Sequence, residues 1–92
     1  MTPIFLEDTQ EILQRLALAV QQADSVAIRH AAHTIKGTSA SMALTKLSQL
    51  SREMEMAAKE ENLANAPHLL EQIQAEFKRA EAALTQMGHT TV

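Results

Sequence analysis

The chain has 92 residues, a formal net charge of −3 and no cysteine. A chain of this length builds one hydrophobic core, so we expect a single domain over residues 1–92. Eight basic residues spread along the chain do not form the dense cationic surface that phosphate-backbone binding needs, which argues against nucleic acid as the partner, and the lack of cysteine excludes a disulfide scaffold and a thiolate nucleophile.

Hydrophobic residues make up 46% of the chain, but only two residues are aromatic, and glycine and proline occur twice each. A core of Leu, Ile, Val, Met and Ala with so few turn residues is typical of packed helices. No apolar run approaches the ~20 residues of a membrane span, and residues 1–6 are too short for a secretory signal. We therefore expect an all-α protein in the cytoplasm, with no membrane contact by this domain.

The first two expected helices are separated by a polar connection. The first covers about residues 3–21, with Pro3 in its first turn. Asp24 and Ser25 are suited to cap the second, which should end within residues 41–44. The apolar residues at helical spacing are Phe5, Ile12, Leu13, Leu16 and Val20 in the first helix and Ile28, Ala31, Ala32, Ile35 and Met42 in the second.

Two more amphipathic segments follow. A third helix is expected at about residues 45–60, and a fourth from Asn65 and Pro67 to Gly88, with residues 88–92 as a frayed tail. Their apolar positions are Leu47, Leu50, Met54, Ala57 and Ala58, then Ala66, Leu70, Ile73, Phe77, Ala80, Leu84 and Met87. Long helices joined by short connections favour antiparallel neighbours, so the pattern predicts an up-down-up-down four-helix bundle.

One stretch of the second helix is not explained by core packing. At 100° per residue, His33 lies about 140° from the core residue Ile28 and points outward. Arg29, Lys36, Gly37 and Ala40 share this outer arc. An exposed histidine alone is usually a solvated surface residue, and Gly37 alone could mark a close helix contact. Together they favour a reactive imidazole.

A phosphoryl group on His33 would explain this arrangement. Lys36 lies on the adjoining turn, where its ammonium group could reach the phosphoryl oxygens. Gly37 costs the helix roughly 1 kcal/mol relative to alanine, and its missing side chain would leave space for a partner. A surface ion pair is weak enough for Lys36 to orient a phosphoryl group without trapping it, as a carrier requires.

The run Ala31 to Ala40, followed by Leu47, Leu50 and Met54-Glu55, resembles the histidine-containing phosphotransfer (HPt) domains of multistep two-component phosphorelays. The resemblance implies a phosphoryl carrier in which His33 accepts a phosphoryl group on Nε2 from a receiver-domain aspartate and passes it to another. It implies that Lys36 stabilises the phosphoryl group and that Glu55 can hold the imidazole Nδ1–H.

The resemblance also implies what binds the domain. The expected partners are response-regulator receiver domains, which contact a surface formed by Arg29, His30, Gly37, Ala40 and Ser41. We expect a monomer with no cofactor of its own, because Mg²⁺ belongs to the receiver. No glycine-rich phosphate loop is present, so the domain should lack ATP-dependent kinase activity.

The sequence departs from the family pattern where the second helix ends. HPt domains usually have glycine in this turn, whereas this chain has Met42-Ala43. Alanine at positive φ would cost on the order of 1 kcal/mol, so we expect either a reshaped turn or a longer second helix. The first helix also begins close to the start of the chain, which suggests an excised or minimal domain.

Alternatives to this interpretation remain open. The third and fourth helices look more like the C-terminal module of a hybrid sensor kinase than a stand-alone shuttle or a chemotaxis-type kinase domain. A structural or protein-binding adaptor, in which His33 is incidental, is the main alternative function. A metal site at His30 and His33 is disfavoured because no convergent carboxylate is evident among Asp24 and Glu53.

Overall fold

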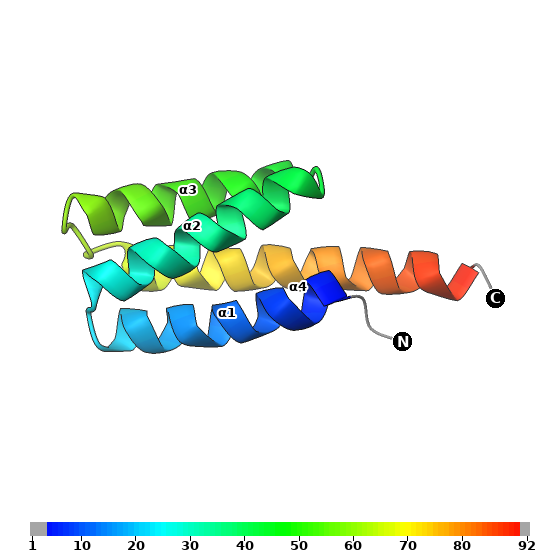
Figure 1. Ribbon diagram of the computed structural model, residues 1–92, viewed down its shortest axis with the longest axis horizontal. Helices are drawn as coiled ribbons and strands as arrows, with labels where there is room; N and C mark the ends of the chain where they lie inside the picture. Colours follow the sequence, from blue (N-terminus) through cyan, green and yellow to red (C-terminus); the bar gives the residue numbers. More distant parts are fainter. Residues whose placement is uncertain (1–3, 91–92) are drawn as a thin grey trace.

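The computed structural model describes residues 4–90, and side chains within residues 7–83. It contains α1 (Ile4–Gln21), α2 (Ser25–Ser41), α3 (Thr45–Lys59) and α4 (Ala66–Thr90). Each helix packs against its neighbour in the chain, and α4 also packs against α1 (Figure 1). The predicted all-α, up-down-up-down bundle is confirmed.

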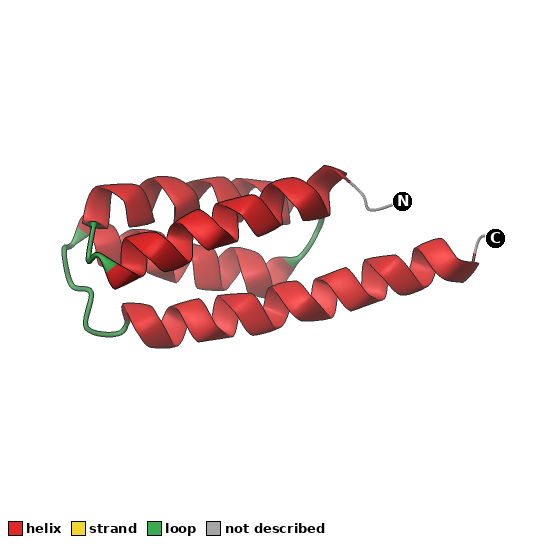
Figure 2. Ribbon diagram, turned by 90° about the horizontal axis from the view of Figure 1, so that it is seen from below, coloured by secondary structure: helices red, strands yellow, loops and turns green. Residues whose placement is uncertain are grey.

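The helix boundaries lie close to their predicted positions. Asp24 caps α2 as predicted, because its Oδ1 accepts a hydrogen bond from the backbone N–H of Ala27 at 3.2 Å. α4 continues past Gly88 to Thr90, and its last turns extend beyond the other helices (Figure 2). Pro3 and the tail residues 91–92 lie outside the described residues.

Most of the core is made of residues that the helical spacing indicated, but Ala19 and Leu69 are also buried, and the predicted Leu70 is only partly buried. Leu16, Ile28, Ile35 and Met54 are fully buried, each with 0% of its surface exposed. Met42 is wrong as a core residue, since 43% of its surface is exposed. α2 ends at Ser41, so Met42 follows the helix and leaves its apolar face. The side chains of Phe5, Leu84 and Met87 lie outside the described ones.

The first three helices end in the same way, with a left-handed residue that is not glycine. Ala23, Ala43 and Glu61 have φ of 54°, 58° and 56°. At each end two backbone N–H groups donate back into the last turn; Ala43 donates to Ala40 and Leu44 donates to Ser39, which is the Schellman pattern. The turn after α2 is therefore neither reshaped nor replaced by a longer helix. The prediction was wrong because these paired hydrogen bonds hold Ala43 in the left-handed region.

Candidate functional site

His33 lies on the outer face of the closely packed α2–α3 pair. The opposite side of α2 is fixed in the core by Ile28, Ala32 and Ile35, none of which is exposed. Because a helix turns 100° per residue, burying these three side chains turns His33 toward solvent. Its side chain is 67% exposed, as the helical wheel predicted.

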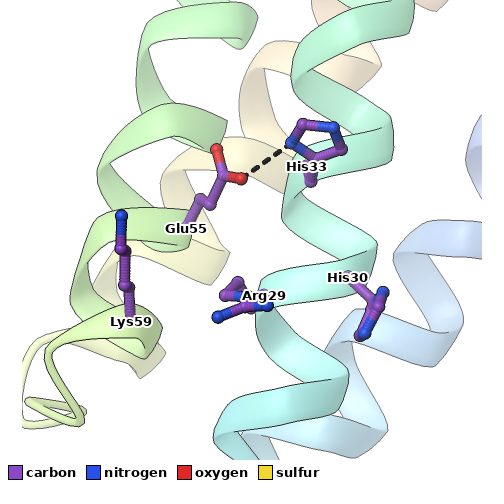
Figure 3. A pocket seen from close by; sticks show the side chains of 5 residues that line it. All are labelled: Arg29, His30, His33, Glu55 and Lys59. Atoms are coloured by element: carbon purple, nitrogen blue, oxygen red, sulfur yellow. Dashed lines mark hydrogen bonds and ion pairs between the residues drawn. The ribbon is translucent and has the colours of Figure 1, made fainter.

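The imidazole is held from α3 by a carboxylate. Nδ1 of His33 lies 2.7 Å from Oε2 of Glu55, and Nζ of Lys36 lies 2.6 Å from the other oxygen, Oε1 (Figure 3 shows the His33–Glu55 contact). Only 18% of the Glu55 side chain is exposed, compared with 32% of Lys36. One carboxylate therefore bridges two side chains that stand one turn apart on α2.

The charge on Glu55 determines which way the histidine hydrogen bond runs. The hydrogen bond from Lys36 lowers the pKa of Glu55 below its usual value, and the contact with His33 lowers it further against the opposing effect of burial. An ionised carboxylate only accepts hydrogen bonds, so Nδ1 must carry the hydrogen and donate it. In the neutral ring, Nε2 then keeps its lone pair, and Figure 3 shows this nitrogen turned away from Glu55.

Two hollows flank His33 along α2. The first has a volume of about 330 Å³ and is lined by Arg29, His30, His33, Glu55 and Lys59. The second, of about 560 Å³, is lined by His33, Thr34, Gly37, Thr38, Ser41 and Met42. A partner that covers His33 would therefore meet a charged surface on one side and a neutral surface on the other.

Gly37 is not required for packing within this chain. A Cβ atom added at this position would meet no atom within 4 Å. The open space is on the outside of α2, in the second hollow beside His33. The alternative in which Gly37 accommodates another helix of the bundle is therefore excluded, and the free surface is available to a partner.

The structure brings most of the predicted site residues together. Arg29 and His30 line the first hollow, and Gly37 and Ser41 line the second. Ala40 is exposed but lines neither hollow. Lys36 is close to His33 as predicted, although its ammonium group is bound to Glu55.

Sequence reasoning missed Lys59. This residue lies one turn beyond Glu55 on α3, and Arg29 lies one turn before His33 on α2. In an antiparallel pair, the register that places His33 beside Glu55 also places Arg29 opposite Lys59. The spacing of Glu55 and Lys59 was therefore a usable signal, but only once the helix register was known.

No three His, Asp or Glu side chains converge as metal ligands within the part of the chain that the structure describes. None of the helices described there combines the length and apolar character needed to cross a bilayer.

Comparison with known proteins gives two similarities. The sequence model of a family described as "Hpt domain" matches residues 1–83. The crystal structure of histidine-containing phosphotransfer protein B (HptB) from Pseudomonas aeruginosa PAO1 is similar, with a TM-score of 0.88 and 36% sequence identity. The match covers 90% of this chain and 72% of the HptB chain. No curated protein sequence matched in the corresponding search.

Proposed function

The chain belongs to the Hpt domain family of phosphoryl carriers in His–Asp phosphorelays, and on this basis we propose that His33 is the residue that carries the phosphoryl group. The observation that supports this assignment is the 2.7 Å contact between Nδ1 of His33 and Glu55. It fixes the ring in the tautomer that leaves Nε2 as the nucleophile, and Nε2 belongs to a side chain that is 67% exposed.

The transfer step follows from this geometry. The Nε2 lone pair attacks the phosphorus of a receiver aspartyl phosphate, and the bond between phosphorus and the aspartate oxygen breaks to release the carboxylate. The product ring carries the phosphoryl group on Nε2 and a hydrogen on Nδ1, so it is positively charged. Glu55 stabilises that charge across the existing hydrogen bond, and the reverse reaction transfers the phosphoryl group to the next aspartate.

Lys36 has two tasks in this proposal. Before transfer it donates to Glu55, which keeps the carboxylate ionised and in place. After transfer it stabilises the phosphoryl oxygens, which compete with Glu55 for the same ammonium group. Replacing Lys36 with alanine should therefore slow transfer less completely than the loss of His33.

The surroundings of the domain are proposed from the same family membership. We infer that receiver domains contact Arg29, His30, Gly37, Ala40 and Ser41, that the domain is a cytoplasmic monomer, and that it has no kinase activity and no cofactor. The Mg²⁺ needed for transfer would then be held by the receiver. We propose a hybrid sensor kinase as the larger context, with a receiver in the same chain, which the flanking sequence of the full protein would test.

The direct test is phosphotransfer from a phosphorylated receiver domain, followed as acid-labile, base-stable label on the protein. We expect label on the wild type and none on His33→Gln. His68→Gln is the matched control, because His68 is an exposed histidine in the first turn of α4, in a hollow that does not include His33. Label that persists in His33→Gln would contradict the assignment, and no label on the wild type from any receiver would favour the adaptor alternative.

A further inference from the structure

The first hollow brings together two cations from opposite helices. Arg29 on α2 and Lys59 on α3 are both exposed, and both line the hollow beside the His33–Glu55 pair (Figure 3). They come from positions 30 residues apart in sequence and meet only because α2 and α3 pair in this register.

The positive charge in this hollow is not neutralised by the fold. Both oxygens of Glu55 are already occupied, one by His33 and the other by Lys36. Among the ion pairs of the described residues, neither Arg29 nor Lys59 has a partner. The lining of the hollow therefore contains two cations, Arg29 and Lys59, and one carboxylate, which Lys36 already binds.

The second hollow has no comparable charge. Its hydroxyl groups donate to backbone carbonyls one turn earlier, as Thr38 does to Thr34 at 2.9 Å and Ser41 does to Gly37 at 3.1 Å. Because these hydroxyl groups already donate within α2, they do not require hydrogen-bond acceptors at fixed positions on a partner. The chemical difference between two candidate receivers would therefore be sensed mainly in the first hollow.

We propose that Arg29 and Lys59 form an acid-recognition site, which binds carboxylates on the receiver face beside its phosphoacceptor aspartate and so orients and selects the receiver. This proposal rests on the proposed function. Complementary charges at an interface raise the association rate and suppress wrong partners more than they raise affinity. Two cations on different helices also define an axis across the α2–α3 pair, one turn from the His33–Glu55 contact, which a single charge would not do.

The test is the rate of phosphotransfer from phosphorylated receivers that differ in the number of carboxylates on that face. With an acidic receiver at low salt, Lys59→Glu and Arg29→Glu should each lower the second-order rate constant about tenfold. The loss should shrink at 1 M salt, where the Debye length is about 3 Å. Lys78→Glu is the matched control. It changes the net charge of the protein by the same amount, but at a lysine of the α1–α4 hollow, and should alter the rate less than twofold.

A charge exchange gives the stricter measurement. Changing a receiver carboxylate to lysine should restore transfer to Lys59→Glu while slowing transfer to the wild type. If Lys59→Glu behaves like Lys78→Glu at low salt, the acid-recognition site is wrong although the carrier function stands. If the wild type accepts no phosphoryl group from any receiver, both proposals fail together. Unchanged circular dichroism melting of the variants would show that the fold is intact.

Discussion

Two hollows of nearly equal volume lie on opposite sides of the bundle, one of about 330 Å³ on the α2–α3 face and one of about 350 Å³ between α1 and α4. The α1–α4 hollow has buried Leu13 and Phe77 among its lining residues, and polar side chains such as Gln14 and Gln74 complete it. Its size is similar, but its chemistry is not.

The difference lies in what connects the helices. Across α2 and α3, Glu55 links His33 and Lys36, and Ser48 donates to the Lys36 carbonyl at 3.3 Å. Between α1 and α4 the described side chains form neither a hydrogen bond nor an ion pair, and these two helices pack less extensively. The two hollows therefore cannot be told apart by volume; what distinguishes the α2–α3 face is a cross-helix polar network around an exposed histidine.

Removing Glu55 should have the largest effect in this comparison. Glu55→Ala is expected to lower the transfer rate about 10- to 100-fold, by analogy with the loss of an orienting partner of a metal-binding histidine. Glu55→Gln keeps a carbonyl that accepts from Nδ1 and should retain more activity. Glu81→Ala, which alters a carboxylate of the α1–α4 hollow, is the matched control and should leave the rate unchanged.

A readout specific to positioning is the tautomer of His33, measured by ¹⁵N chemical shifts. The ring should populate both neutral tautomers in Glu55→Ala and mainly the Nδ1–H form in the wild type. Equal tautomer populations in the two proteins would refute the positioning role.

The same contacts make the stability of the fold depend on pH. Because folding lowers the pKa of Glu55, the contribution of the Glu55 carboxylate to the free energy of unfolding is complete above the unfolded-state pKa and is lost as the pH falls through the folded-state pKa.

The next largest effect on the transfer rate is expected from Gly37→Gln. The new side chain would enter the second hollow beside His33 and give it a glutamine, as the α1–α4 hollow already has. We expect Gly37→Gln to slow transfer about tenfold by crowding the receiver, a penalty of about 1.4 kcal/mol. The fold should be intact, since an added Cβ meets nothing within 4 Å.

Gly37→Ala separates docking from folding. Alanine should stabilise α2 by about 1 kcal/mol relative to glycine, and its single methyl group should leave transfer nearly unchanged. Thermal melting and transfer rates of the three proteins give both quantities. Full transfer activity in Gly37→Gln would show that this surface is not covered by the receiver.

How far the sequence predicts this molecule depends on the range of the interactions. His33, Lys36 and Gly37 belong to one helix, so helical geometry alone placed them near each other. Glu55 came from the family resemblance and Lys59 was missed, because their proximity to α2 depends on the register between two helices. That register is set by packing of the whole core, to which local periodicity gives no access.

The helix ends show the same limit. The Asp24 cap was predicted because it depends on a local hydrogen bond. Ala43 was misjudged because alanine rarely adopts positive φ, and the backbone hydrogen bonds that offset this cost come from the preceding turn. The low propensity of alanine for positive φ predicted the energetic cost of this conformation, but it did not predict the backbone hydrogen bonds that compensate for that cost.

The smallest predicted effect tests whether stability and function are separable within the α2–α3 half. Ala43→Gly should stabilise the protein by about 0.5–1 kcal/mol. Glycine removes a left-handed strain of about 1–2 kcal/mol, and this gain outweighs the loss of about 0.4–1 kcal/mol caused by the greater backbone entropy of the unfolded chain. Ala40→Gly is the matched control, since the same change three residues earlier, inside α2, should destabilise by about 0.5–1 kcal/mol. In thermal melting, opposite shifts of a few degrees are expected. Transfer by Ala43→Gly should equal that of the wild type because Ala43 lines neither of the hollows beside His33. Shifts of the same sign would mean that Ala43 is not held in the left-handed conformation.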